Sequence, residues 1–554
     1  MKELTEKTYQ TDVLVVGAGG AGLRAAIEAR NAGADVLIVS KGDYPNGCVT
    51  AVAMGAMSAR LGKSDSADRH YEDTIKGGYQ LNNPKLVRLL VDNAADRAKD
   101  IERYGTEFEK KDNEYDLFLY TGNSVPRAVQ SGDQYRGGFF RGLVKEAARL
   151  GLQVIQHVMV TDLLKQAGAV KGAVALNLDT KEIMVIKAKA VIMATGGAGS
   201  VYSLTTNPPG ITGDGYALAF NAGAKLMDME FVQTRAAMIV PAAMRGTPPP
   251  GDGLVTEGGR FYNGLLERYM RKYHPEKAEN VTRSEISLCT QKEIMEGRNS
   301  PNGGVYGDFS GVSDKDLNRF KAFVQSCRDC NYDPSYQPYE WAPGAHYFIG
   351  GIVIDDECRT SVPGLLAAGE VEGGVMGANR LGGNALAETQ VFGAIAGATA
   401  ASMATAEDSP EIEPQEISRA KEHIRSILGR TSGVDYREVN KTLSELMSRY
   451  AGVLRNESGL RMAIEAMEDI RRDKIDRICV SGAATPQDLS GIFETENILT
   501  IGRIILQAAL MRTESRGAHN REEYPQMDDN WLKNIIFEKR DGEAVASIMP
   551  IIGT

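Results

Sequence analysis

Three spaced glycines near the amino terminus are the residues whose types and spacing most directly indicate a chemical role. Gly17, Gly19 and Gly22 follow the apolar run Asp12-Val-Leu-Val-Val, and a second apolar run ends at Ser40-Lys41. In a strand, turn and helix, the first glycine permits a tight turn, the second lets the backbone approach a pyrophosphate, and the third lets the helix pack on the strand. The segment therefore predicts a dinucleotide site, although Ser40-Lys41 stands where an acidic residue is expected.

Three further glycine-rich segments extend this pattern along the chain. They are Ala194-Thr-Gly-Gly197, Thr206 to Gly215, and Gly364 to Glu388. With the first motif, and with Glu514 to Trp531 near the carboxy terminus, they resemble the flavoprotein family of succinate dehydrogenase, fumarate reductase and L-aspartate oxidase. The resemblance runs from about Thr11 to about Trp531. It implies FAD as the cofactor, and the cofactor-binding positions are then Gly17, Gly19, Gly20, Gly22, Ser40, Lys41, Gly55, Thr195, Gly196, Asp214, Glu370, Asn384 and Leu386.

The resemblance also implies which polar residues bind the substrate and which deliver a proton to it. A flavin reduces an activated C=C bond by passing hydride from N5 to one carbon while an acid protonates its neighbour. An arginine suits a carboxylate because its planar fork binds both oxygens. The family pattern implies that a small dicarboxylate contacts His346, Arg380, Thr256 and Arg235. It implies that Arg283 donates the proton and that Glu257 and Arg260 resupply it.

Three positions depart from the family pattern. Arg235 in Val232-Gln-Thr-Arg replaces a histidine that binds the second carboxylate, which leaves the identity of the substrate open. Ser284 follows Arg283 where the family usually has aspartate. Val49 occupies the position of the histidine that bonds covalently to the flavin in membrane-bound relatives. We therefore expect noncovalent FAD, with a thioether to the neighbouring Cys48 as the less favoured alternative.

The elements that position these residues predict an α/β protein. We expect a doubly wound, Rossmann-like FAD-binding domain with an inserted α+β capping domain and a carboxy-terminal helical bundle. The expected boundaries are 1–228 and 346–407 for the two parts of the FAD-binding domain, 229–345 for the cap, 408–534 for the helical domain and 535–554 for a tail. An inserted cap over the cofactor can exclude water.

Length, composition and net charge limit the kinds of protein that this chain can be. At 554 residues the chain is too long for one core, and 25% charged with 42% hydrophobic residues is ordinary for globular proteins. A net charge of −10 argues against a nucleic-acid partner. The sequence has no apolar run of about 18 residues and no signal-peptide core at its start. We therefore expect a cytoplasmic location, with membrane contact only through partners.

The cysteines predict neither a disulfide framework nor a metal centre. Six are scattered over the chain, and the pair Cys327-Arg-Asp-Cys330 has no second pair after it. No metal ligands are therefore assigned. Since the chain lacks a cluster motif, the resemblance implies that electrons are exchanged with a separate iron-sulfur subunit.

These observations predict an oxidoreductase subunit of the fumarate reductase or succinate dehydrogenase type, acting at a CH-CH bond of a small dicarboxylate. The nearest alternatives are L-aspartate oxidase and a reductase of a different enoate. A flavin-binding electron-transfer subunit without substrate chemistry belongs to another class. The retained His346, Arg380, Arg283 and Glu257 argue against it, because electron transfer alone needs no carboxylate clamp.

Overall fold

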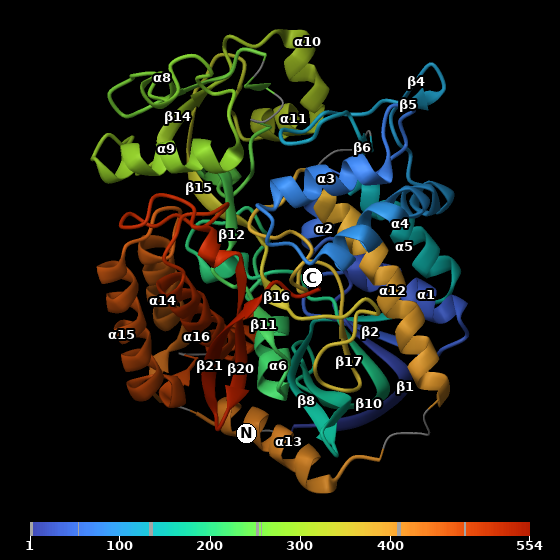
Figure 1. Cartoon of the computed structure of the whole chain (residues 1–554). Coiled ribbons are helices and arrows are strands. Elements are labelled where there is room, and N and C mark those ends of the chain that lie inside the picture. Colours follow the sequence, from blue (N-terminus) through green and yellow to red (C-terminus); the bar gives the residue numbers. More distant parts are fainter. Residues whose placement is uncertain are drawn as a thin grey trace.

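A seven-stranded sheet lies at the base of the molecule (Figure 1). The computed structural model describes residues 4–53, 55–131, 137–250, 254–255, 257–406, 411–430, 432–480 and 484–553. The strand order is β7-β2-β1-β10-β9-β8, and β17 also pairs with β10. The parallel strands are β1 (Glu6–Val16), β2 (Val36–Ser40), β7 (Gln153–Gln156), β10 (Ile183–Met193) and β17 (Leu365–Ala367). The antiparallel pair β8 (Val158–Gln166) and β9 (Ala169–Asn177) extends one edge.

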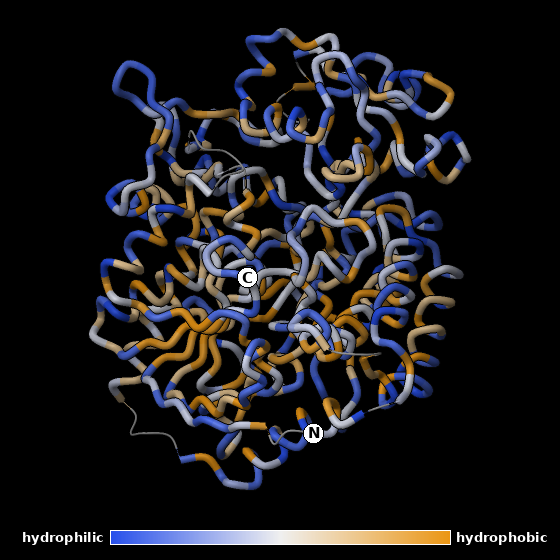
Figure 2. The backbone as a smooth tube through the Cα atoms, turned by 180° about the vertical axis from the view of Figure 1, so that it is seen from behind, coloured by the Kyte–Doolittle hydropathy of each residue, from blue (hydrophilic) through white to orange (hydrophobic). Residues whose placement is uncertain are grey.

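Helices cover this sheet because its central strands are apolar on both faces. Val13 to Val16 are buried, as expected for a strand in the middle of a parallel sheet. α1 (Gly20–Asn31) packs against α12 (Asn384–Ala406), which begins more than 350 residues later in the chain, and α4 (Pro84–Arg103) packs on α12 in turn. Figure 2 shows the resulting contrast between the hydrophobic strands inside and the more polar helices outside. The arrangement confirms the α/β fold class.

A second, antiparallel sheet forms the upper part of the molecule in Figure 1. Its order is β12 (Val232–Val240), β15 (Tyr339–Phe348), β14 (Val305–Asp308) and β13 (Arg260–Tyr262), and α9 (Arg283–Met295) packs on β12 and β15. It has its own cluster of buried apolar residues, between Met238 and Trp341. We call this unit the cap. Its strands β12 and β15 connect it to the rest of the chain.

The carboxy-terminal part combines four helices with a β-hairpin. The helices are α13 (Pro414–Leu428), α14 (Tyr436–Tyr450), α15 (Glu457–Asp473) and α16 (Pro486–Met511). Residues 535–554, expected as a tail, fall largely within the hairpin of β20 (Lys533–Arg540) and β21 (Glu543–Pro550). This hairpin pairs with β11 (Leu226–Met227), which in turn pairs with β16 (Gly351–Ile352). The end of the chain thus completes a sheet that begins in the first half.

Several shorter helices are also named below. They are α2 (Val49–Val52), α3 (Ala67–Gly77), α6 (Asp214–Ala222), α8 (Met270–Tyr273) and α11 (Lys321–Asp329). Within the described part of the chain, no helix has the length and apolar character needed to cross a membrane.

Candidate active site

A cavity of about 1250 Å³ opens at the carboxyl ends of the parallel strands. Its wall includes the β1–α1 turn, the end of β2, the loop from Thr206 to Asp214, the start of α12, part of α16, and residues of the cap. Ligands of doubly wound sheets bind at this edge of the sheet. The cavity is therefore the candidate site for both the cofactor and the substrate.

The glycines of the β1–α1 turn have different physical roles. A Cβ atom at Gly17, where φ is +113°, would lie 2.3 Å from the carbonyl oxygen of Ala194. A Cβ atom at Gly22 would lie 1.8 Å from the carbonyl oxygen of Gly17, so helix and strand could not pack as they do. At Gly19, in contrast, the nearest atom would be 3.8 Å away. Gly17 and Gly22 serve the protein's own packing, whereas Gly19 keeps space for a bound group.

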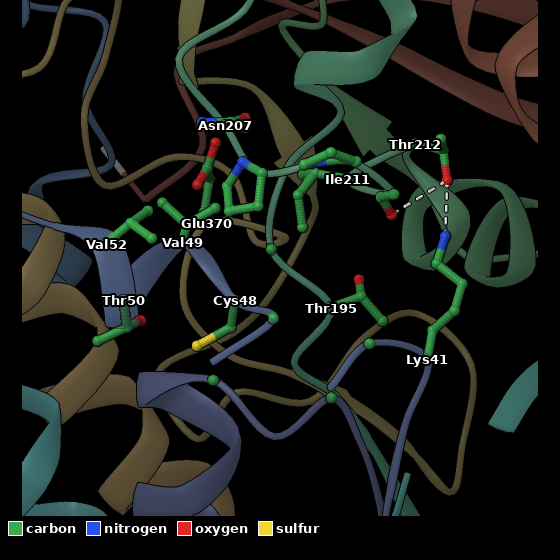
Figure 3. A pocket seen from close by; sticks show the side chains of 18 of the residues that line it. Lys41, Cys48, Val49, Thr50, Val52, Thr195, Asn207, Ile211, Thr212 and Glu370 are labelled. Carbon is green, nitrogen blue, oxygen red and sulfur yellow. Dashed lines mark hydrogen bonds between the residues drawn. The ribbon is translucent and has the colours of Figure 1, made fainter. Parts of the chain in front are cut away.

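The polar groups on the cavity wall fit a dinucleotide such as FAD. Thr195 Oγ1 and Asn207 Oδ1 are buried and have no hydrogen-bond partner among the described residues. Figure 3 shows Thr195 projecting into the space between Lys41 and Thr212 on one side and Asn207 and Glu370 on the other. A buried polar atom without a partner is unfavourable, so these two atoms indicate that a ligand supplies the missing bonds.

Lys41 connects three elements at one end of the cavity. Its Nζ lies 2.5 Å from Asp214 at the start of α6 and 2.8 Å from Glu494 on α16. It also donates to the hydroxyl of Thr212 at 2.9 Å (Figure 3). Although burial alone would lower the pKa of Lys41, the two carboxylates raise it above its usual value. The helical domain thus contributes directly to the wall of the cofactor site.

Most of the predicted cofactor residues line the cavity, and two do not. Gly17, Gly19, Gly20, Ser40, Lys41, Gly55, Thr195, Gly196, Asp214, Glu370 and Leu386 form part of its wall. Gly22 is absent from the wall and acts through packing, as described above. The side chain of Asn384 is instead bonded to His70 Nε2 at 2.9 Å and to the hydroxyl of Thr74 at 3.2 Å. Asn384 thus holds α12 against α3, which differs from the expected contact with the cofactor.

Four predicted substrate and proton-donor residues line the same cavity. Arg235 comes from β12, His346 from β15, Arg283 from the first turn of α9, and Arg380 from the loop before α12. Burial lowers the pKa of His346 well below its usual value, and the positive charges of Arg235, Arg380 and Arg283 lower it further. His346 is therefore neutral, and the three guanidinium groups make this end of the cavity strongly electropositive.

His346 is oriented by the loop that follows β10. Its Nδ1 lies 2.6 Å from the hydroxyl of Thr206, and its carbonyl oxygen accepts a hydrogen bond from the side chain of Asn207. A neutral imidazole that accepts the Thr206 proton at Nδ1 carries its own proton at Nε2. In that form His346 donates a hydrogen bond to an anionic ligand.

Arg380 is held on two sides. Its Nε and Nη2 atoms donate to the side-chain oxygen of Gln233 at 3.2 and 2.9 Å, and its guanidinium lies 4.6 Å from the centre of the Tyr347 ring. Burial, together with the charges of Arg283 and Arg235, lowers the pKa of Arg380 to about 10. The group stays charged at neutral pH, and its remaining donors are available to a ligand.

Arg283 is the first residue of α9. Thr282 and Glu285 form a reciprocal capping box that fixes the start of the helix at this point. A cation at the amino end of a helix lies against the helix dipole, where an anionic side chain would be favoured. The Arg283 guanidinium lies on the cavity wall, 6.0 Å from the centre of the Tyr120 ring.

Comparison with known proteins agrees with this geometry. Residues 12–386 match the family described as FAD binding domain, and residues 440–552 match the family described as fumarate reductase flavoprotein C-term. The chain belongs to the succinate dehydrogenase and fumarate reductase flavoprotein family. It is an FAD-dependent oxidoreductase.

Individual relatives cover nearly the whole chain. An uncharacterized FAD-dependent oxidoreductase of Methanocaldococcus jannaschii is 38% identical, over 96% of this chain and 98% of its own length. A subunit of the CoM/CoB fumarate reductase of Methanothermobacter marburgensis is 37% identical, over 97% and 98%. The structure of Escherichia coli quinol fumarate reductase superimposes with a TM-score of 0.92 at 30% identity, covering 98% of this chain and 97% of that one. L-aspartate oxidases are also among the relatives, at 31% and 33% identity.

The expected proton relay of the family is only partly assembled at the cavity. Among its three residues, Arg283 lines the wall, whereas Glu257 and Arg260 are not among the described lining residues. Glu257 is exposed, and Arg260, at the start of β13, donates to the carbonyl oxygen of Gly259 at 2.7 Å. Thr256 lies outside the described residues. The relay therefore stays a prediction.

The residues that support the four ligand-facing side chains were not predicted from the sequence. Thr206 orients His346, while Gln233 and Tyr347 hold Arg380. The Tyr347 hydroxyl in turn donates to the buried carboxyl of Glu388. Gln233 lies two positions from Arg235, and Tyr347 directly follows His346, so nearness in sequence to a ligand-facing residue was the available signal.

The cysteines do not form a metal site in the described part of the chain. All six are free, and no group of three or more His, Cys, Asp or Glu side chains is placed to hold a metal ion there. Cys48 lines the cavity, and burial raises the pKa of its thiol to about 11. It is therefore protonated and unreactive at neutral pH.

Proposed function

We propose that this chain is the flavoprotein subunit of an enzyme that reduces the C=C bond of fumarate or a closely related dicarboxylate. The convergence of Arg235, Arg283, Arg380 and neutral His346 on one cavity supports this proposal more than any other observation. Three guanidinium groups in one site match a ligand that carries two carboxylates. The names of the fumarate reductase relatives support the same substrate class.

Each residue then has a defined part in the reaction. Arg380 and Arg235 bind the two carboxylates, and His346 donates a hydrogen bond that keeps the substrate plane fixed. Bound FAD supplies the hydride for one carbon of the double bond. Arg283 gives a proton to the neighbouring carbon. Glu257 and Arg260 return a proton to Arg283, which is the family's relay applied to this chain.

The electrons come from a partner. We propose an iron-sulfur subunit, because several relatives are named as subunits and no metal-binding group lies in the described part of this chain. The relatives differ in the donor that their names give, CoM/CoB in one and quinol in another. We therefore assign no final donor. We also propose a cytoplasmic location, with any membrane contact made through the partner.

An anaerobic half-reaction tests the function. The FAD-loaded protein is reduced with dithionite, excess reductant is removed, fumarate is added, and the flavin absorbance is followed. Prompt reoxidation with formation of succinate is expected. A parallel sample receives L-aspartate in air, with peroxide as the readout.

The two arms separate the candidate functions. Reduced flavin that is reoxidised neither by fumarate nor by a related unsaturated dicarboxylate would overturn the proposal. Peroxide release with aspartate would instead establish an L-aspartate oxidase. Reoxidation by a bulkier or more anionic enoate, but not by fumarate, would identify Arg235 as the mark of another substrate.

A further inference from the structure

The three arginines of the site stand on three separate elements, and one hydrogen-bonded chain of side chains connects those elements. Gln233 lies on β12, two residues before Arg235. Asn379 directly precedes Arg380, and Ser284 directly follows Arg283. Each of these polar side chains is thus a neighbour in sequence of one ligand-facing arginine.

Gln233 is the centre of this chain. Its side-chain oxygen accepts from Nε and Nη2 of Arg380, and its side-chain nitrogen donates to Arg380 O at 2.9 Å and to Asn379 Oδ1 at 3.0 Å. Gln233 is 2% exposed, and all of these bonds stay inside the protein. A buried amide that satisfies its donors and acceptor against one partner loop fixes both the side chain and the backbone of that loop.

Asn379 carries the connection to the cap. Its Oδ1 also accepts from the hydroxyl of Ser284 at 3.5 Å, and its Nδ2 donates to the carbonyl oxygen of Gly77 at 3.1 Å. At 3.5 Å the Ser284 contact is longer than an ordinary O–H···O hydrogen bond, and it is therefore weak. It is nevertheless a side-chain contact between the arginine-bearing turn of α9 and the arginine-bearing loop.

The strand pairing explains why Gln233 occupies this position. In the ladder between β12 and β15, Gln233 is directly opposite Tyr347. Gln233 binds the edge of the Arg380 guanidinium, and Tyr347 stacks on its face. One cross-strand pair therefore holds Arg380, while Arg235, two residues after Gln233, and His346, directly before Tyr347, line the cavity.

We propose that Gln233 and Asn379 are positioning residues, which set the spacing between Arg380, Arg235 and Arg283 for a substrate with two carboxylates. This inference rests on the proposed function, since it assigns the arginines to a dicarboxylate. Neither residue touches the reacting atoms. Their effect is to keep the guanidinium groups at a fixed separation before the substrate arrives, so that little ordering remains to be done on binding.

The test measures dicarboxylate binding separately from turnover. Malonate cannot be reduced, and its binding to the FAD-loaded protein is followed by the change in flavin absorbance. In Gln233→Leu, which keeps the bulk but removes every hydrogen bond, we expect the malonate Kd and the fumarate KM to rise together, by about tenfold to a hundredfold. Because the contact is made equally before and during the reaction, kcat should change by less than about threefold.

Two further variants complete the design. Gln233→Glu keeps acceptors for Arg380, but its charge neutralises the guanidinium and it loses the bonds to Asn379, so malonate binding should weaken at least as much as in Gln233→Leu. Gln390→Leu is the matched control, since Gln390 is a buried glutamine on α12 that is bonded to Gly20 O and to Thr389. It should lower the melting temperature without changing the malonate Kd.

The outcomes are separable. A malonate Kd within twofold of the unchanged protein in either FAD-loaded Gln233 variant would overturn the inference. If both variants lose FAD, the milder variant Ser284→Ala is used instead. We expect its malonate Kd to rise twofold to fivefold. An unchanged Kd would contradict a connection between Ser284 and Asn379 that positions Arg283. Failure of the proposed function looks different, because the unchanged protein would then neither bind malonate nor reduce fumarate.

Discussion

At the scale of single residues, the site is a set of guanidinium groups with a neutral histidine among them. Arg235, in place of the family's histidine, adds a permanent charge to a site that already holds Arg283 and Arg380. The same charges, after burial, keep His346 unprotonated. The proposed binding of a dicarboxylate thus depends on groups that do not titrate near neutral pH.

Removing the proposed proton donor, Arg283, should stop the chemistry and leave the cofactor in place. In Arg283→Ala we expect kcat for fumarate to fall by about a hundredfold to ten-thousandfold, the usual range for a general acid. The assay uses a reduced dye as electron donor, and FAD content is measured in parallel. Arg271→Ala, at an exposed arginine on α8 of the same cap, is the control. Undiminished turnover in Arg283→Ala would show that another group delivers the proton.

Restoring the family residue at position 235 should weaken binding of the dianion. In Arg235→His we expect the fumarate KM to rise about tenfold, since a charge-assisted hydrogen bond contributes roughly 1.5 to 3 kcal/mol. Arg245→His provides the comparison, because Arg245 also lines the cavity but is exposed. If Arg235→His and Arg245→His raise the fumarate KM equally, Arg235 acts only through the electrostatic field of the site.

The pH dependence of binding follows from the direction of two pKa shifts. His346 has its pKa well below the usual value, so it stays neutral from about pH 6.5 upwards. Arg380, with a pKa of about 10, is charged below that pH and loses its charge as the pH rises through it. The fumarate KM should therefore be flat between about pH 6.5 and 9 and then rise. A KM that changes severalfold around pH 7 would contradict this assignment.

At the scale of elements, the β1–α1 turn separates packing from binding. Gly22→Ala should destabilise the fold itself, because its Cβ would lie 1.8 Å from a carbonyl oxygen. Gly19→Ala meets nothing closer than 3.8 Å, so its fold should be normal while its affinity for FAD falls. Melting temperatures of the FAD-free proteins and FAD titrations distinguish these effects. Equal loss of stability in both variants would contradict the division of roles.

The elements that could be predicted from the sequence are those whose signals are local. The glycines of the β1–α1 turn, the apolar strands and the arginine of the loop before α12 are each recognisable within a few residues, and the structure places them together. Contacts between distant segments were not predictable in this way. Lys41 pairs with Glu494, Asn384 turns to His70, and Tyr347 bonds to Glu388, and in each case the partner is set by tertiary packing. For Glu257 and Arg260 the local signal was not sufficient. Their sequence matches the family pattern, yet they are not among the described lining residues of the cavity.

At the scale of the whole molecule, the cofactor is enclosed by three parts of the protein. The body supplies the glycine turns, the cap supplies Arg283, and the helical domain supplies Glu494. Such enclosure can retain a dinucleotide by shape and many weak contacts. No covalent bond to the flavin is needed for this.

Denaturation should accordingly release the cofactor. Val49 cannot bond to the flavin, and the Cys48 thiol, with a pKa of about 11, is protonated. After acid precipitation we expect FAD in the supernatant and a colourless pellet, measured by absorbance. Colour that stays in the pellet of the unchanged protein but is released from Cys48→Ser would instead demonstrate a thioether.

The hairpin of β20 and β21 has a consequence for how the protein is made. The hairpin pairs with β11, which in turn pairs with β16, so residues 226–227 and 351–352 share a sheet with residues 533–550, which are synthesised after both. Arg512 and Asn534 also bond to the buried carboxylates of Glu230 and Asp228, which stand beside β11. Although domains generally fold during synthesis from the amino end, this sheet cannot be completed until residues 533–550 have been synthesised.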